Sequence, residues 1–460
     1  MSHNASLQGL LHVSAALLLI VVSAQLCGRL ARLCRQPAVL GEMICGVLLG
    51  PTLLGAVAPE LGGYLFNAGS RSTLYAISMI GLSLYMFLVG LQHDHRGSQS
   101  RERTLPYLLA AVGIAGPLVV GGATALTVLS KFRPAGVSKL VFALFVGGAL
   151  AVTAFPMLAR VLEERKIAHT RFGVLATTAA AVDDALAWCL LAIVAALATD
   201  GSVIGALRTL IPAICMVIGL FALLPRVLRR PMQRAAAQGH ISDQLFVTVL
   251  GIVLAVGWLS DYIGIYSVFG GFICGVAMPK VAGFTDRFVT MTSAVVRCLL
   301  LPIFFAYSGL NTDLRGMLDV RRLVPLLVLV LVAVLSKSLT AYGVLRGIYR
   351  WPHHRAAAMG ALMNSRGLMI LIFINAGLSM KLIPQSLFSM LVVVAVVTTG
   401  LAVPAYRHYV SDEQERQDRL EALAEASAPA RLGHPDQPHS PAPKQPAALT
   451  ATHQASERTA

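Results

Sequence analysis

The chain has 460 residues, of which 56% are hydrophobic and only 13% are charged, and its mean hydropathy is +0.71. Soluble domains carry about 25% charged residues, so the composition excludes an ordinary soluble protein and predicts an integral membrane protein. The formal net charge of +15 has a plain cause, because cytoplasmic loops of membrane proteins collect Lys and Arg. No zinc-finger or RNA-binding pattern accompanies it. We therefore expect membrane lipid around the chain and no nucleic-acid partner.

Thirteen segments come close to the roughly 20 mostly apolar residues that a spanning helix needs. The first has no basic leader and no small-residue cleavage site, so we expect a retained helix and no signal peptide. We divide the chain into an N-terminal tail (1–8), a transmembrane domain (9–408) and a C-terminal tail (409–460). The predicted spans lie near 9–28, 38–56, 73–92, 104–128, 140–160, 172–198, 203–225, 244–260, 263–279, 289–310, 323–345, 356–378 and 385–407.

The charges in the loops give an orientation. If the first loop is cytoplasmic, the loops on its side carry 19 Lys and Arg and the opposite loops carry 9. The side richer in Lys and Arg is normally the cytoplasmic one. We therefore expect an external N-terminus, a cytoplasmic C-terminus and a place in the plasma membrane. The richer loops are 29–35, 93–103, 160–171, 226–234, 279–287 and 346–355.

The composition changes after residue 410. Residues 411–426 could form a short charged helix, and from 427 the chain is mostly Ala, Pro, Ser, Gln and His. Such a segment has little to bury, so the tail is predicted to be largely disordered and cytoplasmic. No GxGxxG motif occurs in it, so we expect neither a nucleotide-binding domain nor a cofactor.

Two predicted spans, the fifth and the twelfth, are interrupted by polar residues or proline. The fifth contains Thr153 and Pro156, and the twelfth contains Asn364, Ser365 and Arg366. The two interrupted spans are seven spans apart, and an odd number of spans reverses the orientation in the membrane. Spans 1–6 and 8–13 are therefore predicted to be inverted repeats, with the seventh span as linker. Paired broken segments in matching positions are a sequence sign of a transporter's binding site.

Two adjacent acids, Asp183 and Asp184, lie in the apolar sixth span. Each ionised Asp at the bilayer centre costs about 2.5–3.5 kcal/mol on insertion scales. A purely structural role is one interpretation. An aspartyl protease dyad is disfavoured, because neighbours on one helix point about 100° apart and no partner acid in a protease-like motif stands on another span. We favour the third interpretation, in which one carboxylate binds a proton or a cation in turn, because membrane acids mark ion paths and proton relays.

Three further charged residues within predicted spans are candidates for a role at the site. Lys337 is near the middle of the eleventh span, and its expected partner is Asp183 or Asp184, with snorkelling to the interface as the alternative. Glu42 lies about one turn inside the cytoplasmic face and is either structural or an accessory to the ion path. Arg366 is expected to cap carbonyl groups of the broken twelfth span.

Several stretches, in the right order over about 30–407, resemble the sodium/proton exchanger domain of the monovalent cation:proton antiporters. The branch that looks most similar contains the plant cation/proton exchangers and the bacterial potassium-efflux antiporters. The stretches are PAVLGEMICGVLLGPTLLG (37–55), LYMFLVGLQ (84–92), AVTAFPMLARVLEE (151–164), AAAVDDALAW (179–188), SVFGGFICGVAMPK (267–280), LPIFFAYSGLNTDL (301–314) and ALMNSRGLMILI (361–372).

The resemblance implies an all-α membrane fold of about thirteen helices, with a core domain, a dimerisation domain and two discontinuous helices that cross beside the acids. It implies a homodimer and elevator-like alternating access. By motif, Asp184 matches the family's essential ion-carrying aspartate and Asp183 the variable position before it. Lys337 matches the core lysine, and Thr153 matches the polar residue at the first break.

The sequence departs from that branch at two positions. Asp183 stands where the branch commonly has Asn, and an Asp–Asp pair with a core Lys resembles the electrogenic exchangers, which move two protons per cation. Ile370 stands where close relatives often have Glu. Both departures bear on the stoichiometry and on the choice of ion.

The sequence therefore predicts a secondary antiporter, not an enzyme, which exchanges cytoplasmic Na⁺ or K⁺ for external protons. The monovalent cation is expected to bind at Asp184 as the transported ion. Two other classes stay open at this point. One is an ion-coupled symporter of an organic anion, and the other is a membrane sensor that transports nothing.

Overall fold

The computed structural model describes residues 2–92, 104–200, 203–315, 317 and 319–427. Within these ranges the chain is helical and forms no strands. Eleven helices are long and apolar enough to cross a membrane, and one further bent pair of helices raises this number to twelve. The predicted ninth span is a shorter apolar helix over Ser267–Ala277. The all-helical membrane fold is confirmed, and the count of thirteen stays a prediction.

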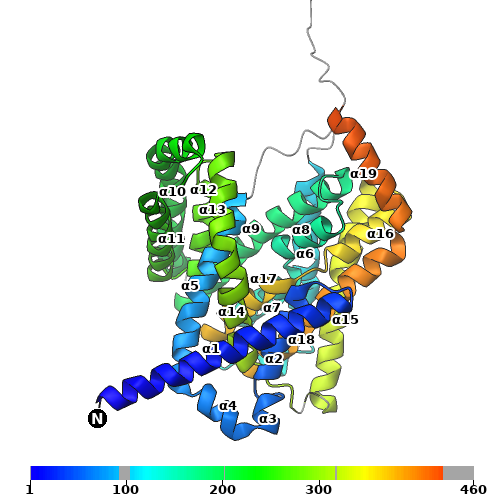
Figure 1. The fold of residues 1–460 in the computed structure, drawn as a ribbon. Coiled ribbons are helices and arrows are strands. Elements are labelled where there is room, and N and C mark those ends of the chain that lie inside the picture. Colours follow the sequence, from blue (N-terminus) through cyan, green and yellow to red (C-terminus); the bar gives the residue numbers. More distant parts are fainter. Residues whose placement is uncertain (1, 93–103, 201–202, 316, 318, 428–460) are drawn as a thin grey trace, which may run out of the picture.

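The helices follow the predicted spans in order (Figure 1). Three short helical turns, η1 (Ser130–Phe132), η2 (Val296–Leu300) and η3 (Gly343–Ile348), join or extend them. The α-helices are α1 (Ser2–Leu33), α2 (Ala38–Leu49), α3 (Leu54–Val57), α4 (Pro59–Leu65), α5 (Ala68–Gln92), α6 (Leu105–Leu126), α7 (Lys139–Ala151), α8 (Phe155–Glu164), α9 (Arg171–Asp200), α10 (Val203–Gln238), α11 (Asp243–Ile263), α12 (Ser267–Ala277), α13 (Ala282–Val295), α14 (Leu301–Leu310), α15 (Val320–Tyr342), α16 (His353–Leu362), α17 (Gly367–Ser379), α18 (Gln385–Tyr409) and α19 (Asp412–Ser427).

Some boundaries differ from the predicted ones. Helix α1 begins at Ser2, ahead of the predicted start near residue 9. Helix α10 continues through 226–234, which the sequence placed in a loop. Leu228, Met232 and Ala235 are buried at helical spacing, whereas the four arginines of the segment are exposed. The charges that suggested a loop therefore lie on the outer face of an amphipathic helix. The predicted loop at 93–103 lies outside the described residues.

The helices pack as two groups. One contains α1, α2, α5 and α11–α14, and the other contains α6–α9 and α15–α18, while α10 contacts α9 in one group and α12 and α13 in the other. Within the first group α2 crosses α14 at Gly46 and Gly309, where a Cβ on either residue would overlap the backbone of the other helix. This close approach requires glycine. In Figure 1, α5 and α11–α13 of the first group lie at the left together with α10, and α15 and α16 of the second group lie at the right.

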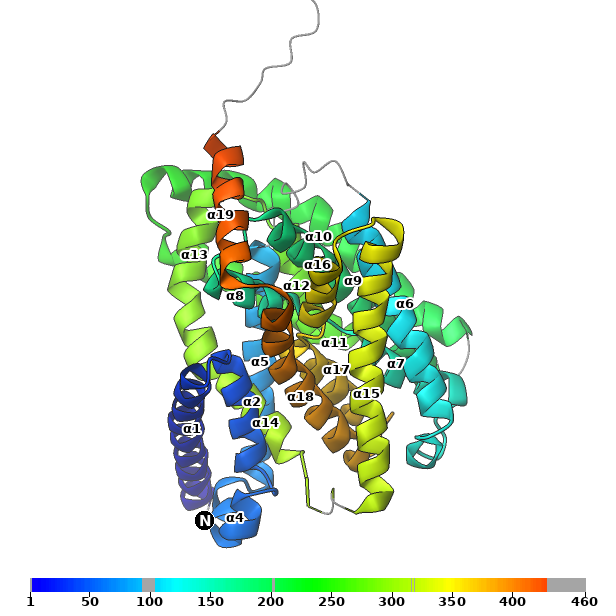
Figure 2. The same cartoon turned by 90° about the vertical axis from the view of Figure 1, so that its right-hand side faces the viewer.

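The C-terminal helix α19 binds to the second group through ion pairs. Arg165 just after α8 contacts Glu415 at 2.6 Å and Asp412 at 3.2 Å, and Arg355 in α16 contacts Asp418 at 2.7 Å. Glu415 is only 3% exposed. Figure 2 shows α19 beyond the end of α18, on the side of α8 and α16. The short charged helix expected over 411–426 is therefore present, and its acids find basic partners on the core. Residues 428–460, where disorder is expected, lie outside the described residues.

We expect Glu415→Ala to lower the free energy of unfolding by about 1.5–3 kcal/mol, because it leaves the half-buried Arg165 guanidinium without its closest carboxylate. The matched control is Glu413→Ala, an exposed acid on the same helix, which should change stability by less than about 0.5 kcal/mol. Thermal unfolding in detergent measures both, and limited proteolysis reports release of α19. Equal unfolding temperatures for the two variants would contradict the docking.

Candidate functional site

The predicted break in the fifth span lies between α7 and α8. Helix α7 ends at Ala151, and both Val152 and Ala154 are extended, with ψ of 132° and 104°. Pro156 falls in the first turn of α8, where a residue without an N–H is tolerated. The break leaves carbonyl groups at the end of α7 and amide groups at the start of α8 without helical partners. At membrane depth these groups need partners from the protein.

The second predicted break separates α16 from α17, which are bent by 44°. Gly367 begins α17 with a φ of +45°, and a Cβ there would press against the side chain of Met157 on α8. Both constraints favour glycine. The two breaks touch, because the Ala154 amide donates to the Ser365 carbonyl at 2.8 Å. The discontinuous helices therefore meet as the family resemblance implies.

The acid pair lies against the start of α8. The Thr153 amide donates to Asp183 Oδ2 at 2.7 Å, and the Phe155 amide donates to Asp184 Oδ2 at 3.2 Å. Both acids come from α9 and are buried, at 1% and 0% exposure. A helix N-terminus carries partial positive charge and stabilises anions. The carboxylates thus supply the acceptors that these amides of the break need.

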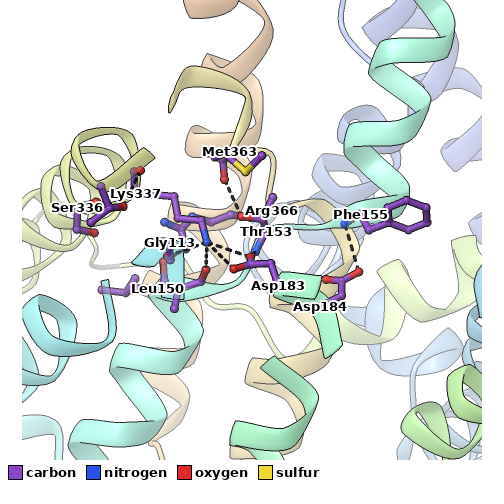
Figure 3. A network of polar contacts seen from close by, with 12 residues as sticks. Gly113, Leu150, Thr153, Phe155, Asp183, Asp184, Ser336, Lys337, Met363 and Arg366 are labelled. Carbon is purple, nitrogen blue, oxygen red and sulfur yellow. Dashed lines mark hydrogen bonds and ion pairs between the residues drawn. The ribbon is translucent and has the colours of Figure 1, made fainter. Parts of the chain in front are cut away.

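Lys337 of α15 pairs with Asp183. Its Nζ lies 2.9 Å from Asp183 Oδ2 and 3.1 Å from Oδ1, and it also donates to the carbonyl groups of Gly113 and Ala151. The side chain is 1% exposed, so the snorkelling alternative is wrong. Figure 3 shows that Asp183 points toward Lys337, whereas Asp184 points toward Phe155.

Arg366 caps the other broken helix, and the expectation that it caps its own span is wrong. Its guanidinium donates to the Leu150 and Ala149 carbonyls at the end of α7 and to the Ala333 carbonyl of α15 at 2.8 Å. A helix C-terminus carries partial negative charge, which favours a cation. Residues of the first break bind the carbonyls of the second break, since Thr153 Oγ1 donates to the Met363 carbonyl at 3.0 Å and the Ala154 amide donates to the Ser365 carbonyl.

The remaining polar residues of the second break support the helices. Asn364 Nδ2 donates to Ser338 Oγ at 2.7 Å and to the Gly360 carbonyl at 3.0 Å, which joins α16 to α15. Ser365 contributes its carbonyl group to the contact with Ala154. Sequence reasoning missed Thr399, whose hydroxyl accepts from the Gly367 amide at 3.0 Å. The polar pair TT (398–399) in an apolar span was its only signal.

The two acids differ in how far their oxygens are used. Both oxygens of Asp183 accept hydrogen bonds from Lys337, and one also accepts from Thr153. Asp184 Oδ1 accepts no hydrogen bond from the part of the chain that the structure describes, and it is buried. Asp184 is therefore the carboxylate that can take a proton or a cation without breaking an ion pair.

A cavity of about 580 Å³ lies next to the segment that holds this acid. Ala154, Phe155 and Pro156 line it, and the Phe155 amide is the one that holds Asp184. Its walls come from both helix groups and include Glu42 of α2 and Arg160 of α8. Glu163, Glu164, Ser293 and Arg297 also line it. The predicted accessory residue Glu42 is thus among the lining residues of this cavity.

A buried carboxylate beside two crossed broken helices, next to a cavity with charged lining residues, is the type of site that secondary transporters build in the membrane. Residues 17–410 match the family model described as "Sodium/hydrogen exchanger, transmembrane". The chain belongs to this family of secondary transporters.

The chain is 37% identical over 396 residues to the Na⁺/H⁺ antiporter NhaS4 of Synechocystis, and the match covers 86% of this chain and 96% of that protein. It is 33% identical to cation/H⁺ antiporter 19 of Arabidopsis thaliana, over 89% of this chain and 52% of that protein. K⁺/H⁺ antiporter 1 of Saccharomyces cerevisiae is 27% identical, over 80% and 42%. The chain thus spans nearly all of the cyanobacterial relative and about half of the plant and yeast ones.

The fold resembles that of the sodium proton antiporter MjNhaP1 from Methanocaldococcus jannaschii, with a TM-score of 0.63. The match covers 90% of this chain and 99% of that one, at 14% sequence identity. At this identity the likeness concerns the fold.

We expect Lys337→Met to lower the free energy of unfolding by about 3–5 kcal/mol, because it leaves the Asp183 carboxylate buried without its cation. Asp183→Asn combined with Lys337→Met removes both charges and should recover most of that loss. Thermal unfolding of the two single variants and the double variant, compared with wild type, gives the coupling. Losses that simply add in the double variant would contradict the ion pair.

Proposed function

We propose that the chain is a monovalent cation:proton antiporter in which Asp184 carries the cation, Na⁺ or K⁺, and the proton in turn. The observation that supports this most strongly is the difference between the acids: Asp183 is bound to Lys337, whereas Asp184 keeps one buried oxygen without a partner among the described residues. The names of the relatives, which include Na⁺/H⁺ and K⁺/H⁺ antiporters, support the choice of ions.

Competition for Asp184 couples the two fluxes. Desolvation disfavours a bare carboxylate, so the buried group is stable when it holds a proton or a cation and costly when it holds neither. The transporter then returns across the membrane only with one of the two ions bound. Exchange follows from single occupancy, and no separate coupling device is needed.

Alternating access requires that the cavity close on one side and open on the other. The cavity lies where α8 of the second group faces α2 of the first group. We propose that the second group, with the acids, moves as a unit against the first, in the elevator-like manner that the family resemblance implies, within a homodimer. Glu42 would attract cations into the cavity opposite Arg160.

The charge distribution in the loops supports a cytoplasmic C-terminus and an opening of this cavity to the cytoplasm. In the plasma membrane the protein would then release cytoplasmic Na⁺ or K⁺ in exchange for external protons. The transported cation is a substrate, and the proposal includes no resident cofactor and no enzymatic step.

Proton-gradient measurements in everted vesicles test the proposal. Addition of Na⁺ or K⁺ should dissipate a respiration-driven pH gradient in vesicles that contain the wild type, and Asp184→Asn should reduce this response at least about a hundredfold while the protein stays folded. The matched control is Asp286→Asn, an exposed acid outside the site, which should keep the wild-type response. Undiminished exchange by Asp184→Asn, or no response of the inserted wild type to either cation, would contradict the proposal.

The Asp183–Lys337 pair offers a place for a second proton. If the cation displaces Lys337 from Asp183, the ammonium can release a proton, and two protons then move per cation. We expect Asp183→Asn to make exchange less electrogenic, because Lys337 loses its carboxylate partner. Transport current under an imposed membrane potential measures this. A voltage sensitivity equal to that of the wild type would count against a role of the pair in charge transfer.

A further inference from the structure

Helix α19 presents four charged residues to the core on a single face. Asp412, Glu415, Asp418 and Arg419 follow one another at spacings that place side chains on one side of a helix. Each of them makes an ion pair or a hydrogen bond to the core. Glu413, which lies off this face, is exposed. The function of this face therefore depends on which parts of the core it joins.

One part is the outer end of α8. Glu415 Oε1 accepts from Arg165 Nε at 2.6 Å, and Arg419 donates to the Arg165 carbonyl at 3.1 Å. Arg165 directly follows the last residue of α8, where free carbonyl groups carry partial negative charge. Its guanidinium also lies 5.5 Å from the centre of the Tyr406 ring of α18. Helix α19 thus holds both the side chain and the carbonyl group at the end of this half-helix.

The other part is the outer end of α16. Asp418 Oδ1 accepts from Arg355 at 2.7 Å, and Arg355 lies in the first turn of α16. A helix N-terminus carries partial positive charge, so a basic residue there is unfavourable unless an acid compensates it. The first turn of α16 contains no acid of its own. Asp418 supplies this negative charge and ties α16 to the helix that also holds α8.

The two helices that α19 joins are the outer halves of the two broken spans, and their inner ends form the ion site. The Phe155 amide at the start of α8 holds Asp184, and the Ala154 amide binds the Ser365 carbonyl just beyond the end of α16. Each half-helix has 10 residues, which corresponds to about 15 Å of helix. Rigid helices of this length can carry a displacement of their outer ends to the ion site.

We propose that Glu415 and Asp418 are positioning residues that hold α8 and α16 at a fixed separation and so set the affinity of the Asp184 site for the cation. Their ion pairs form the α19 clamp. The inference rests on the proposed function, in which Asp184 carries the ion, and it adds α19 to that mechanism. A site whose helices are already held in place loses less conformational freedom when the cation binds.

The α19 clamp lies within the helix group that carries the acids. Its ion pairs reach only the ends of α8 and α16, both of the second group. Movement of this group as a unit against the first therefore does not break the clamp. We expect the clamp to act on cation binding more than on the rate of the movement.

Hydrogen exchange of the full-length protein tests the clamp without a transport assay. Glu415→Gln combined with Asp418→Asn removes both carboxylates. The amides of 152–158 and 361–368, at the two breaks, should then exchange at least about fivefold faster than in the control, because local opening of the breaks costs less free energy. Faster exchange confined to α19 and the outer ends of α8 and α16 would overturn the proposal, since α19 would then be only a surface attachment.

The matched control carries Glu413→Gln and Glu421→Gln, two exposed acids of α19, so both proteins lose the same net charge. It should exchange at the breaks as the wild type does. Asp418→Asn alone breaks only the ion pair with Arg355. It should give a smaller increase in the same regions, and it replaces the double variant if that protein fails to fold.

Transport by the same variants in liposomes tests the link to the ion site. The KM for the cation should be about fivefold higher in Glu415→Gln/Asp418→Asn than in the control, a factor at the lower end of coupling between separate sites, and the maximal rate should change less. A KM equal to that of the control would overturn the assignment of Glu415 and Asp418 as positioning residues. Absence of exchange by the wild type would contradict the proposed function, and hydrogen exchange would still decide whether the clamp holds the breaks.

Discussion

A helix that breaks inside a membrane leaves carbonyl groups on one side of the break and amide groups on the other, and protein groups must satisfy both. The break between α7 and α8 meets this constraint with opposite charges. Lys337 and Arg366 bind carbonyls at the end of α7, and Asp183 and Asp184 accept from amides at the start of α8. The acids are thus placed where the partial charges of the two half-helices favour them.

This arrangement explains why the two neighbouring acids can differ in role. Asp183 is fixed from two sides, by the Thr153 amide and by the Lys337 ammonium. Among the described residues, Asp184 accepts a hydrogen bond only from the Phe155 amide, at 3.2 Å, and it stands next to residues that line the large cavity. One acid completes the structure of the break, and the other is left for exchange. The proposed mechanism depends on this separation of roles within one helical turn.

Much of this was predictable from the sequence because charges in apolar spans are costly and few. That cost identified the acid pair, Lys337 and the interruption at Asn364–Arg366 as the residues to explain. The relation between span number and orientation predicted inverted repeats, and the family resemblance implied that the broken helices cross. The family resemblance then gave the roles of Asp184 and Lys337. The all-helical fold followed from composition and from the length of the apolar segments.

The remaining features depend on tertiary contacts that a sequence does not display. Which acid pairs with Lys337 depends on how α9 is rotated against α15. Arg366 reaches α7 because the two breaks cross, so the residues next to Arg366 in the sequence do not reveal that it caps α7. The residue type does not reveal which backbone carbonyl groups accept hydrogen bonds, as the Gly113 carbonyl does from Lys337. The docking of α19 on the core was not predicted, because its partners Arg165 and Arg355 are far away in sequence.

The most direct test of the account is the dependence of cation affinity on pH. Transport by purified protein in liposomes would be measured at a series of cation concentrations, at several pH values, for the wild type and for Asp286→Asn. Competition for Asp184 predicts that the KM for the cation rises in proportion to proton concentration on the acidic side, whereas the maximal rate changes little. A KM that is independent of pH would show that proton and cation bind to different groups and would contradict the account.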